Sequence, residues 1–64
     1  MFDPERFYLT DDEELTKVWP ASTLANWRWE GRGPAFSKTG KRILYLGRDL
    51  NAFIERHRVE PQAA

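Results

Sequence analysis

The sequence contains no cysteine, one histidine and no long hydrophobic run. Without cysteine there is no disulfide and no thiolate metal or redox site, so packing alone must hold the fold. No apolar stretch approaches the roughly 18 residues of a membrane span, and the first residues lack a signal-peptide pattern. We therefore expect a cytoplasmic protein that does not engage a membrane.

Catalytic signatures are also missing. The chain has no nucleophile–base pair, no glycine-rich phosphate loop and no metal-ligand spacing. Its 64 residues allow one small domain, and such a domain buries only about 60% of its unfolded surface. An active-site pocket would consume that thin core. We expect neither an enzyme nor a cofactor or metal site.

What is present suits a folded domain that meets a polyanion. Hydrophobic residues make up 41% of the chain, including three tryptophans. Net charge is zero, but residues 1–20 carry −4, residues 21–48 carry +5 and residues 49–64 carry −1. The basic middle block could grip a polyanion, or it could be part of an ordinary mixed surface.

The first twenty residues predict an arm followed by a short helix. Residues 1–9 show little periodicity, and we expect Phe7 and Leu9 to tuck onto the core. Thr10 and Glu13 fit a capping box that opens a helix, which accounts for the acidic run as helix-start chemistry. The buried face of this helix is expected to carry Leu15, Val18 and Trp19.

A second helix is expected directly after the first. Pro20 ends the first helix and is welcome at the start of the next, so a tight turn leads into a helix from Ala21. Glycines at 31 and 33 stop it. Its inward face carries Ala21, Leu24 and Trp27, and its outward face carries Ser22, Ala25, Asn26 and Trp29.

A hairpin and a third helix complete the pattern. Extended runs at 35–38 and 42–46 flank a basic turn at Thr39-Gly40. Gly47 precedes a helix whose apolar face carries Leu50, Phe53, Ile54 and His57. We divide the chain into an N-terminal arm (1–9), a folded domain (10–58) and a flexible tail (59–64).

This order predicts a mainly α fold with a small β-hairpin, the winged helix-turn-helix. In that unit the second helix enters the DNA major groove and the hairpin lies beside it. Short polar side chains on the helix reach base edges, and cations near its end and at the hairpin tip hold phosphates. The expected DNA-binding residues are Ser22, Thr23, Asn26, Arg28, Arg32, Lys38, Thr39, Lys41 and Arg42. A bare three-helix unit that uses the same turn for another purpose is the alternative.

The ordered motifs resemble a known family. They run Leu9-Thr10 with Glu13-Glu14-Leu15, then residues 22–28 (STLANWR), residues 30–36 (EGRGPAF) and residues 48–54 (RDLNAFI). This set is similar to the small MerR-like winged helix-turn-helix proteins called excisionases, or recombination directionality factors, and to AlpA-type regulators. The resemblance implies that residues 22–26 lie on the recognition helix and residues 38–42 form the wing. It also implies several copies side by side on bent double-stranded DNA, with a recombinase or integrase as partner.

Two segments depart from the family pattern. Trp19-Pro20 replaces the usual Gly and Ser in the turn, and Leu44 and Leu46 stand where arginines are expected in the second wing strand. The arm or the tail could cover these leucines. Alternatively, they form an apolar patch through which one copy contacts the next on DNA.

Three functions remain open from the sequence. They are an excisionase, a transcription regulator on the same fold, and a protein-interaction module that does not touch DNA. His57 is expected at the core edge or the helix end, and Trp29 is expected to pack against the hairpin or the arm rather than stack on bases. For DNA binding, the surface around Ser22 and the hairpin tip must lie side by side, and the acidic N-terminal third must not block them.

Overall fold

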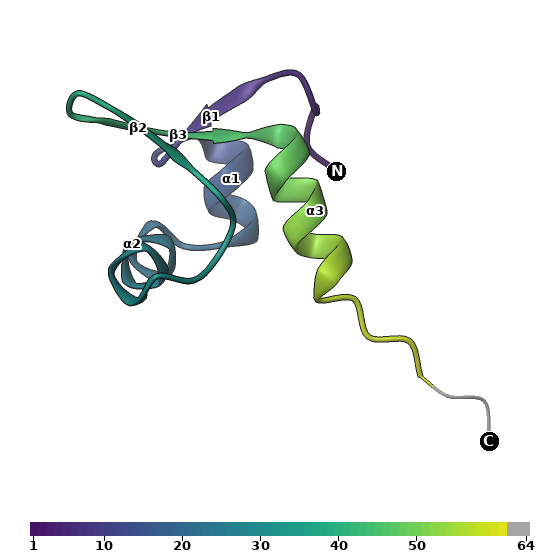
Figure 1. Ribbon diagram of the computed structural model, residues 1–64. Helices are drawn as coiled ribbons and strands as arrows, with labels where there is room; N and C mark the ends of the chain where they lie inside the picture. The colour runs from purple at the N-terminus through teal and green to yellow at the C-terminus, as the bar shows by residue number, and fades with distance from the viewer. Residues whose placement is uncertain (62–64) are drawn as a thin grey trace.

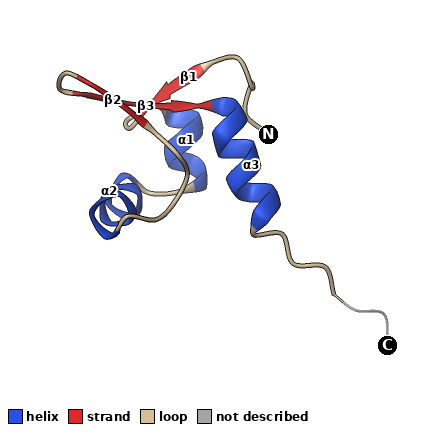
Figure 2. Cartoon of the chain, in the orientation of Figure 1, coloured by secondary structure: helices blue, strands red, loops and turns tan. Residues whose placement is uncertain are grey.

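Three helices lie on one side of a small antiparallel sheet in the computed structural model, which describes residues 1–61 (Figures 1 and 2). The elements are β1 (Phe7–Leu9), α1 (Glu13–Val18), α2 (Ala21–Glu30), β2 (Ser37–Thr39), β3 (Arg42–Leu46) and α3 (Gly47–Arg56). The strand order is β1-β3-β2. Within the described residues, no helix has the length and apolarity needed to cross a membrane. The predicted winged helix-turn-helix is confirmed, with a third strand that the sequence did not indicate.

The start of α1 differs from the prediction. Asp12, not Thr10, caps the helix, and its Oδ1 accepts from the backbone N–H of Glu14 at 2.9 Å. The expected capping box is wrong because a tight turn consumes Thr10, and the Asp12 backbone N–H donates to the Leu9 carbonyl at 3.1 Å. That turn follows directly from the pairing of β1 with the sheet.

The turn between α1 and α2 forms as predicted. Trp19 is extended before the proline, Pro20 caps α2, and the first residue of α2 is Ala21. The Trp19 ring stacks on Phe2 at 6.2 Å between centroids and meets Phe53 edge-on at 5.7 Å. These ring contacts join the turn between α1 and α2 to the N-terminal residues and to α3. Ala21 itself is exposed and does not share the buried face of α2.

Glycine is required after α2. Gly31 ends the helix in the left-handed conformation with φ of 75°. Gly33 has φ of 96°, and a Cβ there would lie 2.9 Å from the Trp27 side chain. The loop can therefore turn closely over Trp27 and lead into β2, which begins at Ser37 rather than Ala35.

The N-terminal residues belong to the folded unit rather than to a separate arm. Phe2 and Tyr8 are buried in the core, whereas Phe7 and Leu9 are exposed. The expectation that Phe7 and Leu9 tuck inward is wrong because side chains alternate along a strand, and Tyr8 takes the inward position. The Asn51 side chain holds Phe2 through its backbone N–H at 2.9 Å and its carbonyl at 2.7 Å.

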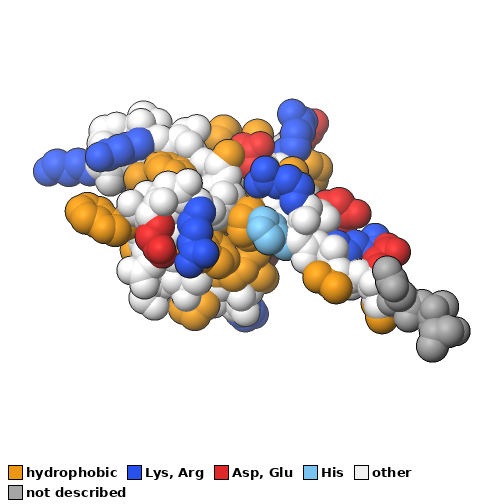
Figure 3. Space-filling model, turned by 60° about the horizontal axis from the view of Figure 1, so that its bottom comes forward, with side chains coloured by type: hydrophobic (Ala, Val, Ile, Leu, Met, Phe, Trp, Pro, Cys, Tyr) orange, Lys and Arg blue, Asp and Glu red, His pale blue; other side chains and the backbone are white. Residues whose placement is uncertain are grey.

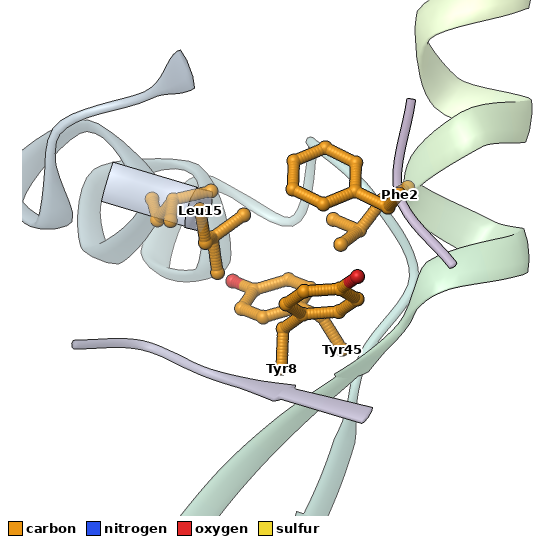
Figure 4. Close-up of a cluster of buried hydrophobic side chains, with 6 residues drawn as sticks. Phe2, Tyr8, Leu15 and Tyr45 are labelled. Carbon is orange, nitrogen blue, oxygen red and sulfur yellow. The ribbon is translucent and has the colours of Figure 1, made fainter. Parts of the chain in front are cut away.

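The core lies between the sheet and the helices. Tyr8 and Tyr45 pair across β1 and β3, and both lie beneath Phe2 beside Leu15 (Figure 4). The remaining buried members of this cluster are Leu24 and Leu50.

The first residue of α3 is Gly47, so this glycine does not precede the helix. Residues 59–61 of the expected tail form no helix or strand, and residues 62–64 lie outside the described residues.

Candidate DNA-binding surface

The outward face of α2 is the first component of the surface. Ser22, Ala25, Asn26 and Trp29 are all exposed, as their spacing of three and four residues predicts. Leu24 on the opposite side is fully buried and anchors the helix to the core. Thr23 is half-buried beside this face. Ser22 and Asn26 are thus free to reach a ligand, and their base contacts stay predictions.

Arg28 is held against the sheet. Its Nη1 donates to the Tyr45 hydroxyl at 2.7 Å, and the side chain is half-buried. The sequence predicted that Arg28 holds a phosphate near the end of the helix and did not indicate this bond. The bond bridges 17 positions of the chain, so only the fold places the guanidinium between α2 and β3.

The hairpin of β2 and β3 is the second component. Lys38, Thr39, Lys41 and Arg42 are all exposed around its turn, where Gly40 has φ of 62°. Lys and Arg side chains stand at this end of the molecule in Figure 3. Within residues 1–61, no carboxylate forms an ion pair with any of these cations. Their charge is available to a ligand.

A hollow of about 300 Å³ joins the two components. It lies between α2 and the hairpin and is lined by Ala25, Arg28, Trp29, Phe36, Lys38 and Ile43. The structure therefore brings the outward face of α2 and the basic hairpin to one surface, which is the arrangement that DNA binding demands. The lining residues include two cations and no carboxylate.

Acidic residues of the N-terminal third lie to one side of this surface. Asp12 and Glu14 pair with Arg6 at 2.9 and 3.5 Å. Asp11 lines a different hollow together with Lys41 and Arg42. The N-terminal acids therefore leave the hollow between α2 and the hairpin open, although the Asp11 carboxylate lies beside the cations of the hairpin turn.

Arg32 lies elsewhere. It is exposed, has its Nη2 3.4 Å from the Glu30 carboxylate, and lines a cavity of about 340 Å³ with Trp19, Phe53 and His57. That cavity lies towards α3, so the structure does not bring Arg32 to the hairpin. His57 ends α3, as predicted, with Nδ1 2.9 Å from the Phe53 carbonyl.

Trp29 is the residue that sequence reasoning misjudged. It is 91% exposed, so the expected packing against the hairpin or the arm is wrong. Phe36, on the other side of the same hollow, is 41% exposed. Its spacing, three residues after Asn26 and seven after Ser22, correctly predicted the outward face of α2, and only the expected packing partner of the ring was wrong.

Leu44 and Leu46 lie on the outer face of the sheet. They pair with Leu9 and Phe7 across β3 and β1, so all four side chains share that face. The N-terminal strand lies beside the leucines and adds two apolar side chains to this face. The chain after α3 runs away from the sheet through residue 61 (Figure 1). Leu44 and Leu46 are half-buried, so the N-terminal strand beside them covers them only in part.

Comparison with known proteins agrees with this geometry. Residues 14–58 match the protein family described as the helix-turn-helix domain, and this span includes α2 and the whole hairpin. No curated protein and no solved structure matches the chain. The match covers more than half of the sequence and ends just beyond α3. The chain belongs to the helix-turn-helix domain family and is a DNA-binding protein.

Proposed function

We propose that the protein is a sequence-specific excisionase, or recombination directionality factor. It binds double-stranded DNA near an attachment site, bends it, and directs an integrase towards excision of a mobile element. The observation that carries the DNA-binding part is the open hollow between the outward face of α2 and the unpaired cations of the hairpin. The excisionase part is supported by the resemblance of the ordered motifs in residues 7–56.

The outward face of α2 recognises the DNA sequence. Asn26 forms a bidentate pair with adenine, and Ser22 and Thr23 contact neighbouring base edges. The hairpin cations Lys38, Lys41 and Arg42 hold phosphates or enter the minor groove, where negative potential concentrates. The protein itself is not an enzyme in this proposal, and the bond breaking and joining belong to the recombinase.

Several copies act together on the DNA. The four apolar side chains on the outer face of the sheet give one copy a surface for the next: Phe7, Leu9, Leu44 and Leu46. Phe7 is 53% exposed and Leu9 is 38% exposed, while Leu44 and Leu46 are half-buried, so the accessible part of this surface lies mainly along β1. A contact between unlike patches on successive copies makes an open row, which suits tandem sites along a duplex.

The test is an excision assay with purified integrase and a plasmid that carries the two attachment sites of the element. We expect the protein to increase excision and to protect adjacent tandem sites in a footprint. The Asn26→Ala variant is expected to weaken both effects, because it loses the discrimination at one base position. Specific binding at a promoter without any effect on excision would refute the proposed role and identify an AlpA-like transcription regulator on the same fold.

A further inference from the structure

The hollow between α2 and the hairpin is lined by both aromatic and cationic side chains. Contacts between α2 and base edges do not explain this combination. Trp29 and Phe36 offer two accessible aromatic rings, and Arg28 and Lys38 offer two cations. In Figure 3, apolar side chains lie directly beside Lys and Arg side chains at the hairpin end of the molecule. A ligand for this hollow must therefore combine a negative charge with an apolar surface.

The position of the hollow indicates which part of DNA has this chemistry. With α2 in the major groove and the hairpin at the adjacent minor groove, the segment between them is one sugar–phosphate strand. We infer that the hollow binds this strand, with Trp29 and Phe36 against a deoxyribose and Arg28 and Lys38 against the two phosphates that flank it. The inference rests on the placement of α2 in the proposed function.

Arg28 is prepared for this contact by the fold. A guanidinium has five N–H donors, and only one is needed for the 2.7 Å bond to the Tyr45 hydroxyl. Tyr45 is itself buried, with its ring 6.0 Å from that of Phe36. The arginine therefore reaches its phosphate from a fixed position, which lowers the entropy lost on binding.

A protein partner fits this hollow less well than DNA. An apolar side chain inserted here would desolvate Arg28 and Lys38 without neutralising them, and unpaired buried charge is costly. A nucleotide strand brings its own anion to these cations. Trp29 has two alternative sites on DNA, which are the methyl group of a thymine and the space between two stacked bases. The experiment distinguishes both from the deoxyribose contact.

The experiment uses a duplex selected from a random library by the full chain, with hydroxyl-radical footprinting because this reagent attacks deoxyribose. We expect Trp29→Ala to lose sugar protection at one nucleotide per bound copy. We expect its affinity to fall roughly 25- to 200-fold if DNA covers about half of the surface that a Trp side chain can bury. The slope of affinity against salt should not change, because no charge is removed. Trp29→Phe should restore most of the protection.

Val59→Ala is the matched control. Val59 is 86% exposed beyond α3, so its loss removes apolar surface away from the hollow and should leave the footprint and the affinity unchanged. Because Trp29 is 91% exposed, the alanine variant should fold, which a thermal melt checks directly. Lys38→Ala should flatten the salt slope by about 0.9 while keeping the sugar contact of Trp29.

Three results would overturn the inference. If Trp29→Ala protects the sugar as well as the unchanged chain does, Trp29 does not contact the deoxyribose. The proposed function would still stand. A loss of affinity when thymine is replaced by deoxyuridine, seen in the unchanged chain but not in Trp29→Ala, would assign the ring to a thymine methyl. Fluorescence of 2-aminopurine that rises only with Trp29 present would assign it to insertion between bases. If the unchanged chain gives no footprint at all, both this inference and the proposed function are overturned.

Discussion

Removal of Lys41 and Arg42 together is expected to flatten the salt dependence of DNA binding. Both side chains are exposed at the hairpin turn, and within residues 1–61 neither forms an ion pair. Each phosphate contact releases condensed counterions, so the logarithm of the affinity falls by about 0.9 per contact for each tenfold rise in salt. The slope therefore counts the cations that touch DNA.

The structure gives the expected count. The four cations in or next to the hollow and the hairpin turn are Arg28, Lys38, Lys41 and Arg42. Four contacts predict a slope of about −3.6, which is roughly a 150-fold loss of affinity between 50 and 200 mM salt. The double alanine variant keeps two contacts, so its slope should be about −1.8 and its loss roughly 12-fold. The weakening should be equal on all sequences.

Arg56→Ala with Arg58→Ala is the control because it removes the same charge from the end of α3. Arg58 is already paired with Glu55 at 3.5 Å and Glu60 at 3.0 Å. Affinity is measured by fluorescence anisotropy at five salt concentrations on a single-site duplex. If the hairpin variant keeps the original slope, or the control flattens it equally, the phosphate contacts are not where the structure places the free cations.

Three further predictions test the fold, the base contact and the self-association. Asn26→Ala should relax base preference at one position by ~1–3 kcal/mol, which selection from a random library measures, and an unchanged preferred sequence would misplace this side chain. Gly47→Ala should destabilise the domain by about 1–3 kcal/mol in urea unfolding, because its Cβ would overlap the carbonyl of Asp3; unchanged stability would show that this close approach is absent. Leu44→Ser with Leu46→Ser should reduce cooperativity on tandem sites in gel shifts while single-site affinity is kept, and equal cooperativity would exclude the outer face of the sheet as the contact.

Local signals in the sequence predicted several elements correctly. Pro20 marked the turn between the first two helices, and α2 does begin at Ala21. The glycines after Glu30 ended α2, and the predicted strand at 42–46 matches β3. Each of these features depends on the conformational limits of residues close together in the chain, so the sequence alone was enough.

Features that depend on distant pairing were missed. The capping of α1 by Asp12 follows from the turn after β1, and β1 exists because it pairs with β3 about 37 positions later. The position of Arg28 depends on a hydroxyl in β3. Trp29 was placed correctly on the outward face of α2, but its expected packing against the hairpin or the arm is wrong, because that contact depends on segments distant in the chain.

The first nine residues help to build the DNA-binding surface without being part of it. A two-stranded hairpin alone is marginally stable in water, and β1 makes it a three-stranded sheet. The Asn51 side chain fastens Phe2 to α3, Phe2 meets Tyr8 edge-on at 5.0 Å, and Tyr8 pairs with Tyr45. Tyr45 in turn accepts the hydrogen bond from Arg28 in the hollow. Contacts that start at the buried Phe2 thus hold a cation in place on the candidate DNA-binding surface.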